Sequence, residues 1–225
     1  MATVMLVHGA FHGPWCWDPV RVGLEARGVT VVAPELPFTG LDDDAGVVAD
    51  ALDALAARDE PVVLCGHSYG GMVISHAASG RDDVAQLVYL CAVQVDDPEE
   101  LGAITRHTPL MDALRVEGEG MSVDPALAAD CFYNDCDPEV AAAAVASLRP
   151  MDARPAAPAA SPVAPAWRTL PSTYVVCTLD RTLDPETQRA MARHAGTVVE
   201  WETGHSPMLS RPELVVDLLE GLTTA

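Results

Sequence analysis

Short apolar runs alternate with amphipathic stretches along most of this 225-residue chain. Strands of a parallel sheet are buried on both faces, so each appears as a continuous apolar run followed by a helix that covers the sheet. The alternation therefore predicts an α/β fold with about six mostly parallel strands flanked by helices. The expected strands are residues 3–8, 29–34, 61–66, 84–91, 172–179 and 197–202.

Helical periodicity is clear in two of the stretches between and after these runs. Apolar side chains recur every three to four residues in residues 45–59 and again near the C-terminus. Both stretches are expected to be helices packed against the sheet. The apolar positions are Val48, Leu52 and Leu55 in the first helix, and Leu214, Val215, Leu218, Leu219 and Leu222 in the last.

The interval between the fourth and fifth expected strands is far longer than an ordinary helical crossover, at about eighty residues. Asp124 and Asp137 each precede a proline, which is typical of a helix N-cap followed by the first helical residue. We therefore expect a small helical cap and a Pro/Ala-rich connector at 95–170, inserted after the fourth strand. The α/β core is then formed by residues 1–94 and 171–225.

Composition excludes several classes of protein. Hydrophobic residues make up 49% of the chain, which argues against intrinsic disorder. The formal net charge is −20, so nucleic acid and anionic membranes are not expected partners. All 13 basic residues are arginines, and the absence of lysine rules out Schiff-base chemistry.

The N-terminal apolar run has no basic region before it and is too short for a signal peptide or a membrane span. A cytoplasmic protein is therefore expected, as a monomer or homodimer. The six cysteines are scattered and are expected to be reduced. Cys131 and Cys136 lack a second pair of ligands at zinc spacing, so no metal site is expected.

A glycine-rich motif, "GHSYGG", carries the clearest chemical signal. Gly66, Ser68 and Gly70 follow an apolar strand and precede a helix. Glycines on both sides of one serine indicate a tight turn that side chains would obstruct. In that context Gly-x-Ser-x-Gly is typical of a nucleophile elbow, which lifts the serine above the carboxyl end of the sheet. Ser68 is the candidate nucleophile.

A nucleophilic serine needs a general base, because its hydroxyl does not ionise near neutral pH. Of the seven histidines, His205 lies just after the last expected strand, on a loop at the same edge of the sheet as the elbow. Ser210 and Glu213 have the spacing of a capping box for the helix that follows. His205 is therefore the candidate base, while His8 is placed to shape the site.

The segment "CTLDRTLDPE" offers two carboxylates to orient that base. Asp184 precedes Pro185 and Glu186, so helix capping is its simplest role. Asp180 has no such role and lies at a strand end. The order Ser68, Asp180, His205 is the order of nucleophile, acid and base in α/β-hydrolases.

An oxyanion hole requires two backbone N–H groups directed at the attacked carbonyl oxygen. The amide of Tyr69, next to the nucleophile, is one candidate. The loop after the first strand, "HGAFHGPW", supplies the other: Ala10 is preferred, with Phe11 second.

Four segments together resemble the α/β-hydrolase superfamily, and within it the branch that contains plant methylesterases and hydroxynitrile lyases. They are "VMLVHGAFHGPWCW", "LCGHSYGGMVISHAA", "CTLDRTLDPETQ" and "GHSPMLSRPELV". The resemblance implies an α/β-hydrolase fold with a helical cap over the site. It covers nearly the whole chain and is weakest in the cap.

The departures from that branch favour ester hydrolysis. Its lyases have a lysine directly after the catalytic histidine and a threonine after the first loop histidine, where this chain has Ser206 and Gly9. Dehalogenases and epoxide hydrolases of the superfamily would have an aspartate in place of Ser68. The expected activity is serine hydrolysis of small to medium apolar carboxylic esters through an acyl-enzyme, without a cofactor.

Two groups of alternatives stay open at this point. One is a thioesterase, lactonase or lyase-type tailoring enzyme on the same scaffold, and the other is a non-catalytic ligand-binding α/β-hydrolase. The pocket is expected between the elbow and the cap. Its expected lining is Phe11, Met111, Leu114 and Phe132.

Overall fold

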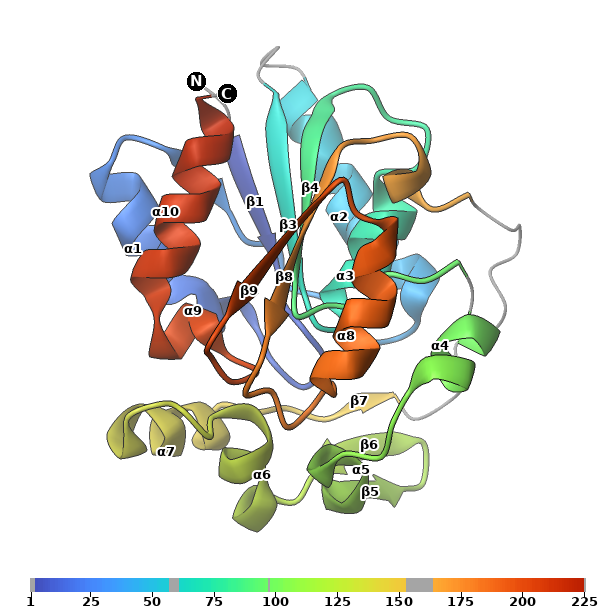
Figure 1. Ribbon diagram of the computed structural model, residues 1–225, viewed down its shortest axis with the longest axis vertical. Helices are drawn as coiled ribbons and strands as arrows, with labels where there is room; N and C mark the ends of the chain where they lie inside the picture. Colours follow the sequence, from blue (N-terminus) through green and yellow to red (C-terminus); the bar gives the residue numbers. More distant parts are fainter. Residues whose placement is uncertain (1–2, 57–60, 97, 153–163, 225) are drawn as a thin grey trace.

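The computed structural model describes residues 3–56, 61–96, 98–152 and 164–224. Its centre is a six-stranded sheet in the order β2-β1-β3-β4-β8-β9, in which every neighbouring pair is parallel (Figure 1). All six predicted strands are confirmed. They are β1 (Thr3–Val7), β2 (Thr30–Val32), β3 (Val62–His67), β4 (Val84–Leu90), β8 (Ser172–Cys177) and β9 (Thr197–Trp201).

Helices cover both faces of the sheet, as the continuous apolar strands require. One face packs against α2, α3 and α8, and the other against α1, α9 and α10 (Figure 1). Val48, Leu52 and Leu55 are buried on α2, and Val215 and Leu219 are buried on α10, as the periodicity predicted. The helices are α1 (Asp18–Ala26), α2 (Leu41–Ala56), α3 (Gly70–Ala77), α8 (Pro185–Met191), α9 (Pro207–Ser210) and α10 (Pro212–Thr223).

The strand order places a switch point between β1 and β3. The chain leaves β1 toward β2 on one side, and after returning through α2 it builds β3 on the other side. Connections that diverge in this way open a crevice at the carboxyl ends of the strands, where open α/β sheets bind ligands. The "HGAFHG" loop follows β1 and "GHSYGG" ends β3, so both motifs lie at this crevice.

The insertion between β4 and β8 lies along the carboxyl end of the sheet (Figure 1). The two predicted helices are present: the Asp124 side chain accepts a hydrogen bond from the Ala126 amide, and Asp137 from the Glu139 amide. Its elements are α4 (Pro98–Ile104), α5 (Pro109–Ala113), β5 (Leu114–Glu117), β6 (Gly120–Val123), α6 (Pro125–Phe132), α7 (Pro138–Ala146) and β7 (Met151–Asp152).

The insertion also contains strands that the sequence analysis did not predict. β5, β6 and β7 form a small antiparallel sheet. These strands are short and mostly half-buried or exposed. Leu114 and Val116 alternate with polar residues, and Met121 and Val123 do so after the turn at Gly118, so the sequence did carry the pattern of a short β-hairpin. Most of the predicted Pro/Ala-rich connector, residues 153–163, lies outside the described residues.

Two further observations concern the chain as a whole. All six cysteines are free thiols. Within the ranges described above, no helix is both long and apolar enough to cross a membrane.

Candidate active site

The turn after β3 has the strained geometry of an elbow. Ser68 has a φ of +53°, which a residue with a Cβ adopts only when its surroundings enforce it. Its carbonyl accepts hydrogen bonds from the Gly71 and Val93 amides at 3.0 and 2.9 Å, and its amide donates to the Leu90 carbonyl at 3.3 Å. These three bonds hold the backbone of Ser68 in place.

The glycines of the motif are required by close backbone approach. A Cβ on Gly66 would lie 2.5 Å from the Gly70 carbonyl oxygen, and one on Gly70 would lie 2.7 Å from the carbonyl oxygen of Val7. Backbone atoms cannot yield at such distances, so any larger residue would displace the turn. The glycines therefore bring the start of α3 against the end of β1.

A buried pair of side chains lies beside this elbow. The Nδ1 atom of His205 donates a hydrogen bond to Oδ2 of Asp180 at 2.7 Å, and both side chains are almost completely inaccessible to solvent. This bond places the imidazole proton on Nδ1 and leaves the Nε2 lone pair available to take a proton. Nε2 of His205 is buried and has no hydrogen-bond partner among the described residues.

Two contacts hold His205 against His67, which precedes the candidate nucleophile Ser68. Nε2 of His67 donates to the His205 carbonyl at 2.8 Å, and the two imidazole rings lie 4.7 Å apart. The Cys91 thiol donates to the same carbonyl at 3.3 Å. His205, the candidate base, is thus attached through its backbone to the end of β3, which precedes Ser68, and to the residue after β4.

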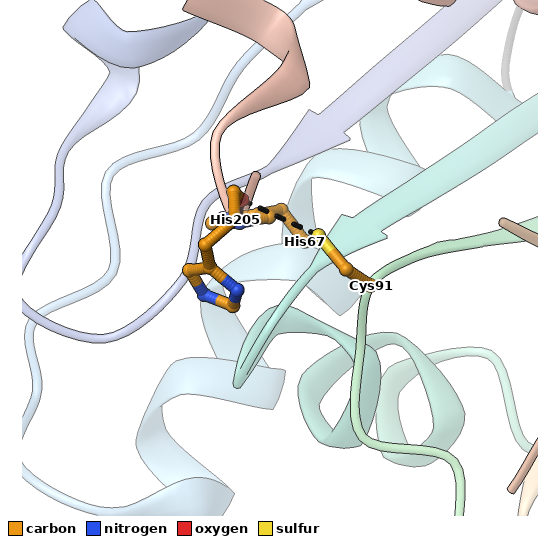
Figure 2. A group of neighbouring side chains, drawn as sticks. All are labelled: His67, Cys91 and His205. Atoms are coloured by element: carbon orange, nitrogen blue, oxygen red, sulfur yellow. Dashed lines mark hydrogen bonds between the residues drawn. The ribbon is translucent and has the colours of Figure 1, made fainter. Parts of the chain in front are cut away.

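The same contacts bring together three side chains that could ligate a metal, His67, Cys91 and His205, with potential ligand atoms within 4.8 Å (Figure 2). Their chemistry does not fit a metal ion. Burial raises the pKa of the Cys91 thiol well above its usual value, whereas a metal requires the thiolate. Nε2 of His67 and the thiol are both occupied as donors to the His205 carbonyl.

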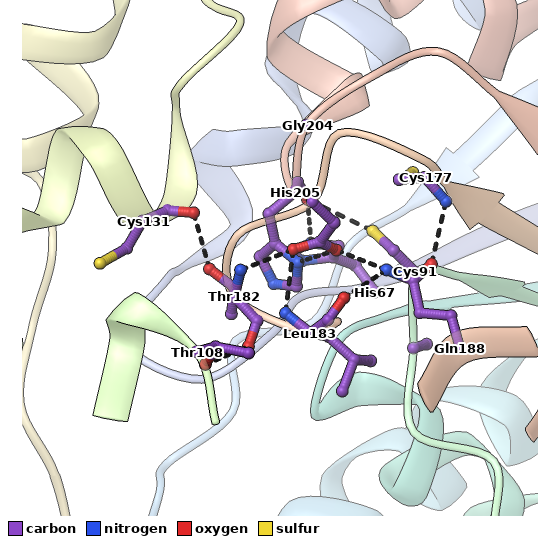
Figure 3. A network of polar contacts seen from close by, with 12 residues as sticks. His67, Cys91, Thr108, Cys131, Cys177, Thr182, Leu183, Gln188, Gly204 and His205 are labelled. Carbon is purple, nitrogen blue, oxygen red and sulfur yellow. Dashed lines mark hydrogen bonds and ion pairs between the residues drawn. The ribbon is translucent and has the colours of Figure 1, made fainter. Parts of the chain in front are cut away.

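The carboxylate of Asp180, the candidate acid, accepts hydrogen bonds at both oxygens. Oδ1 of Asp180 accepts from the Thr182 and Leu183 amides at 2.7 and 2.9 Å. Oδ2 accepts from Nε2 of Gln188 at 2.8 Å as well as from His205. Gln188 also accepts from the Cys177 amide at 2.9 Å and donates to the Leu183 carbonyl at 2.7 Å (Figure 3). Gln188 therefore ties α8 to the end of β8 and to the carboxylate.

Replacing Gln188 with leucine is expected to lower the free energy of unfolding by about 2 kcal/mol, because the Cys177 amide and the Leu183 carbonyl lose this partner and Oδ2 of Asp180 keeps only the bond from His205. Urea denaturation measures the loss. Gln86→Leu is the matched control, since Gln86 is only partly buried and its amide reaches Thr173 on the sheet. A Gln188→Leu variant no less stable than the Gln86→Leu variant would contradict this account.

Two nearby histidines, His8 and His12, form hydrogen bonds at both ring nitrogens and are neutral. His8 donates to the Gly9 carbonyl and accepts from the Leu36 amide, and burial lowers its pKa to about 4. His12 donates to the Ala10 carbonyl and accepts from the Tyr133 hydroxyl, and burial lowers its pKa to about 3. His205 differs from both in having one ring nitrogen unoccupied and the other on a carboxylate.

The amides predicted for an oxyanion hole lie on the two segments that meet at the switch point. A Cβ on Gly9 would lie 2.8 Å from Cβ of Ser68, so the loop after β1 runs against the nucleophile. In the described part of the chain, neither the Ala10 nor the Tyr69 amide donates a hydrogen bond to a backbone carbonyl. The Tyr69 hydroxyl donates to the buried Asp44 carboxylate at 2.7 Å, which fixes the residue after Ser68.

The sequence matches the family model described as "Alpha/beta hydrolase family" over residues 4–218. The chain belongs to the alpha/beta hydrolase family. An esterase of Oryza sativa subsp. japonica is 30% identical to it over 96% of this chain and 93% of its own. Methylesterase 2 of Arabidopsis thaliana is 26% identical over 96% and 93% of the two chains.

A solved structure supports the same placement. The pyrethroid hydrolase of Sphingobium faniae superposes on this alpha/beta hydrolase with a TM-score of 0.83, at 26% identity, over 100% of this chain and 98% of that chain. The esterase and methylesterase relatives confirm the resemblance to the methylesterase branch that the four sequence motifs indicated.

The four residues predicted to line the pocket differ in burial: Phe11 and Phe132 are buried, Leu114 is partly buried and Met111 is exposed. Phe132, from α6, has its ring centre 5.9 Å from that of His205 and 6.3 Å from that of Phe11. Leu114 is partly buried against the same cluster. Met111 is 42% exposed. In this hydrolase Phe132 therefore lies beside the candidate base and Phe11 lies beside Phe132, and a lining role for all four residues stays a prediction.

One local prediction is wrong. Ser210 and Glu213 do not form a capping box, because Pro212 begins α10 and makes Arg211 its N-cap residue. The Ser210 hydroxyl donates instead to Asp135 at 2.9 Å, and Glu213 pairs with Arg211. The predicted N-cap of Asp184 is confirmed: its carboxylate accepts from the Glu186 and Thr187 amides.

Sequence reasoning missed several residues that support the site. It gave no role to Gln188, His67, Cys91, Asn134 or Asp135. Gln188 and Cys91 lie at buried positions that the pattern assigns to packing, and their partners come from distant segments. His67 was marked only as the variable residue of the elbow motif, although its position beside Ser68 was a usable signal.

Proposed function

We propose that this chain is a serine hydrolase that cleaves carboxylic esters through an acyl-enzyme intermediate. The observation that carries the proposal is the buried His205–Asp180 pair at 2.7 Å, with Nε2 of His205 unpartnered, beside a serine on a strained turn. A base with one ring nitrogen on a carboxylate and the other unoccupied is the arrangement that activates a serine.

The reaction proceeds in two half-steps. His205 takes the proton of Ser68 as the oxygen attacks the ester carbonyl, and Asp180 stabilises the imidazolium that forms. The amides of Ala10 and Tyr69 stabilise the negative charge on the carbonyl oxygen. His205 then gives its proton to the leaving alcohol, and water, activated by the same base, releases the acid and restores Ser68.

The substrate class follows from the side chains near the base. Phe11 and Phe132 are apolar, and the nearby His8 and His12 stay neutral at physiological pH because burial lowers the pKa of each. These surroundings favour uncharged, apolar acyl or alcohol groups of small to medium size over charged ones. The esterase and methylesterase relatives support ester hydrolysis as the reaction.

A substrate panel tests the proposal. Purified enzyme is assayed with p-nitrophenyl esters of increasing acyl length, with methyl esters of aromatic acids, and with a thioester and a lactone of matched size. Turnover of carboxylic esters above that of the thioester and lactone is expected. A preference for the thioester or the lactone would place the chain among the alternative enzymes of this scaffold, and binding without turnover of any of them would identify a receptor.

We expect no cleavage of mandelonitrile above the rate without protein. A lyase must stabilise the departing cyanide, and the position after His205 holds Ser206, while Gly9 replaces the loop threonine that the lyases carry. Cyanide release is measured colorimetrically with wild-type enzyme and with Ser68→Ala. Release that depends on Ser68 would overturn the assignment to the esterase side of the branch.

A further inference from the structure

The inserted segment contacts both loops that carry the candidate base and acid. Between α6 and α7, Nδ2 of Asn134 donates to the Leu179 carbonyl at 3.0 Å, one residue before Asp180. Oδ2 of the adjacent Asp135 accepts from the Gly204 amide at 2.7 Å, one residue before His205. Two consecutive side chains thus each bind the backbone directly before a triad residue.

The fit around Gly204 is close. A Cβ on Gly204 would lie 2.5 Å from Oδ1 of Asn134 and 2.5 Å from Oδ1 of Asp135. The same Asp135 oxygen that binds the Gly204 amide also accepts from the Ser210 hydroxyl at 2.9 Å, on the far side of His205 in the sequence. Asp135 therefore fixes the His205 loop at two points.

The loop that carries Asp180 forms two further hydrogen bonds with the insertion, both at Thr182. The Thr182 hydroxyl donates to the Cys131 carbonyl at 2.8 Å, and the Thr108 hydroxyl donates to the Thr182 carbonyl at 3.0 Å (Figure 3). The two loops also meet directly, since the Leu179 amide donates to the Thr203 carbonyl at 2.9 Å. Asn134 and Asp135 complete this junction from the side of the insertion.

We infer that Asn134 and Asp135 are positioning residues that hold His205 and Asp180 in the hydrogen-bonded geometry from which His205 takes the proton of Ser68. The inference rests on the proposed function. Proton transfer is sensitive to displacements of well under 1 Å, and a misplaced base slows the chemical step more than it weakens substrate binding. The insertion then acts on catalysis through its polar contacts as well as covering the site.

The test compares Asp135→Ala with two other variants. Asp135→Ala is expected to lower kcat by about 10- to 100-fold with KM nearly unchanged, because the His205 loop loses both attachments. Asp135→Asn keeps an oxygen acceptor for the Gly204 amide and is expected to recover most of kcat. Asp137→Ala is the matched control: it removes the N-cap of α7, two residues away, and is expected to keep wild-type kcat.

Covalent labelling of Ser68 with a fluorophosphonate, followed by intact mass, separates this inference from the proposed function. Wild-type enzyme that takes up no label would contradict the proposed function itself. If the wild type is labelled and Asp135→Ala retains its kcat, or if Asp135→Asn is as impaired as Asp135→Ala, the positioning role is wrong. The role predicts one adduct on Asp135→Ala, formed more slowly.

If Asp135→Ala does not fold, Asn134→Ala decides the question, because it removes a single hydrogen bond from a partly exposed side chain. A fall in kcat with unchanged KM, and with a melting temperature near that of Asp137→Ala, supports the positioning role. Wild-type kcat in Asn134→Ala would contradict it.

Discussion

Ser68→Ala is expected to lose ester hydrolysis by roughly 10⁴- to 10⁶-fold while folding normally, because the covalent route depends on the serine oxygen. The φ of +53° is set by the backbone bonds of the elbow, which alanine retains. The variant is assayed with the best ester of the panel, and its melting temperature is compared with that of the wild type.

Ser75→Ala provides the control for that experiment. Ser75 lies on α3, and its hydroxyl is buried between the Gly71 carbonyl and the Tyr89 hydroxyl, each at 2.7 Å. Its loss is expected to lower stability by about 1 kcal/mol and to leave turnover near that of the wild type. Near-wild-type turnover in Ser68→Ala, with activity lost in Ser75→Ala, would contradict the assignment of the nucleophile.

Asp180→Asn is expected to lower kcat by about 10⁴-fold, because an amide at this position cannot hold the proton on Nδ1 of His205 or stabilise the imidazolium. The asparagine amide would also face the Gln188 amide, which already donates to Oδ2 of Asp180, so a loss of stability is expected as well. Turnover and melting temperature are measured on the same preparation.

Asp184→Ala distinguishes the two carboxylates of this segment. Its side chain caps α8 through the Glu186 and Thr187 amides, so its removal is expected to cost about 1 kcal/mol with most of the activity retained. If Asp184→Ala loses turnover by orders of magnitude while Asp180→Asn does not, Asp184 is the acid of the triad.

The sequence was sufficient for the parallel sheet and its flanking helices because both depend on local pattern. Most of the strands are buried on both faces and therefore appear in the sequence as apolar runs. Three helices are indicated by an aspartate N-cap followed by proline, at Asp124, Asp137 and Asp184. Ser68, Asp180 and His205 could be proposed because each follows a strand at the same edge of the sheet.

The remaining features depend on contacts between distant segments. β5 and β6 are the exception, because they form a local hairpin whose alternating apolar residues around Gly118 were a usable signal. The bonds of Gln188 to Asp180 and of Asp135 to Gly204 join segments whose meeting depends on the whole fold. Ser210 has the spacing of a capping box, but α10 begins at Pro212, and the Ser210 hydroxyl donates instead to Asp135 of the insertion.

Labelling with a fluorophosphonate tests the central claim most directly, because the reagent reacts with a serine only when a base and an oxyanion hole activate it. Intact mass and peptide mapping are read on wild-type enzyme, Ser68→Ala and His205→Ala. The account predicts one adduct on the wild type, located at Ser68, none on Ser68→Ala, and labelling slowed by orders of magnitude on His205→Ala. An unlabelled wild type, or an adduct that persists in Ser68→Ala, would contradict it.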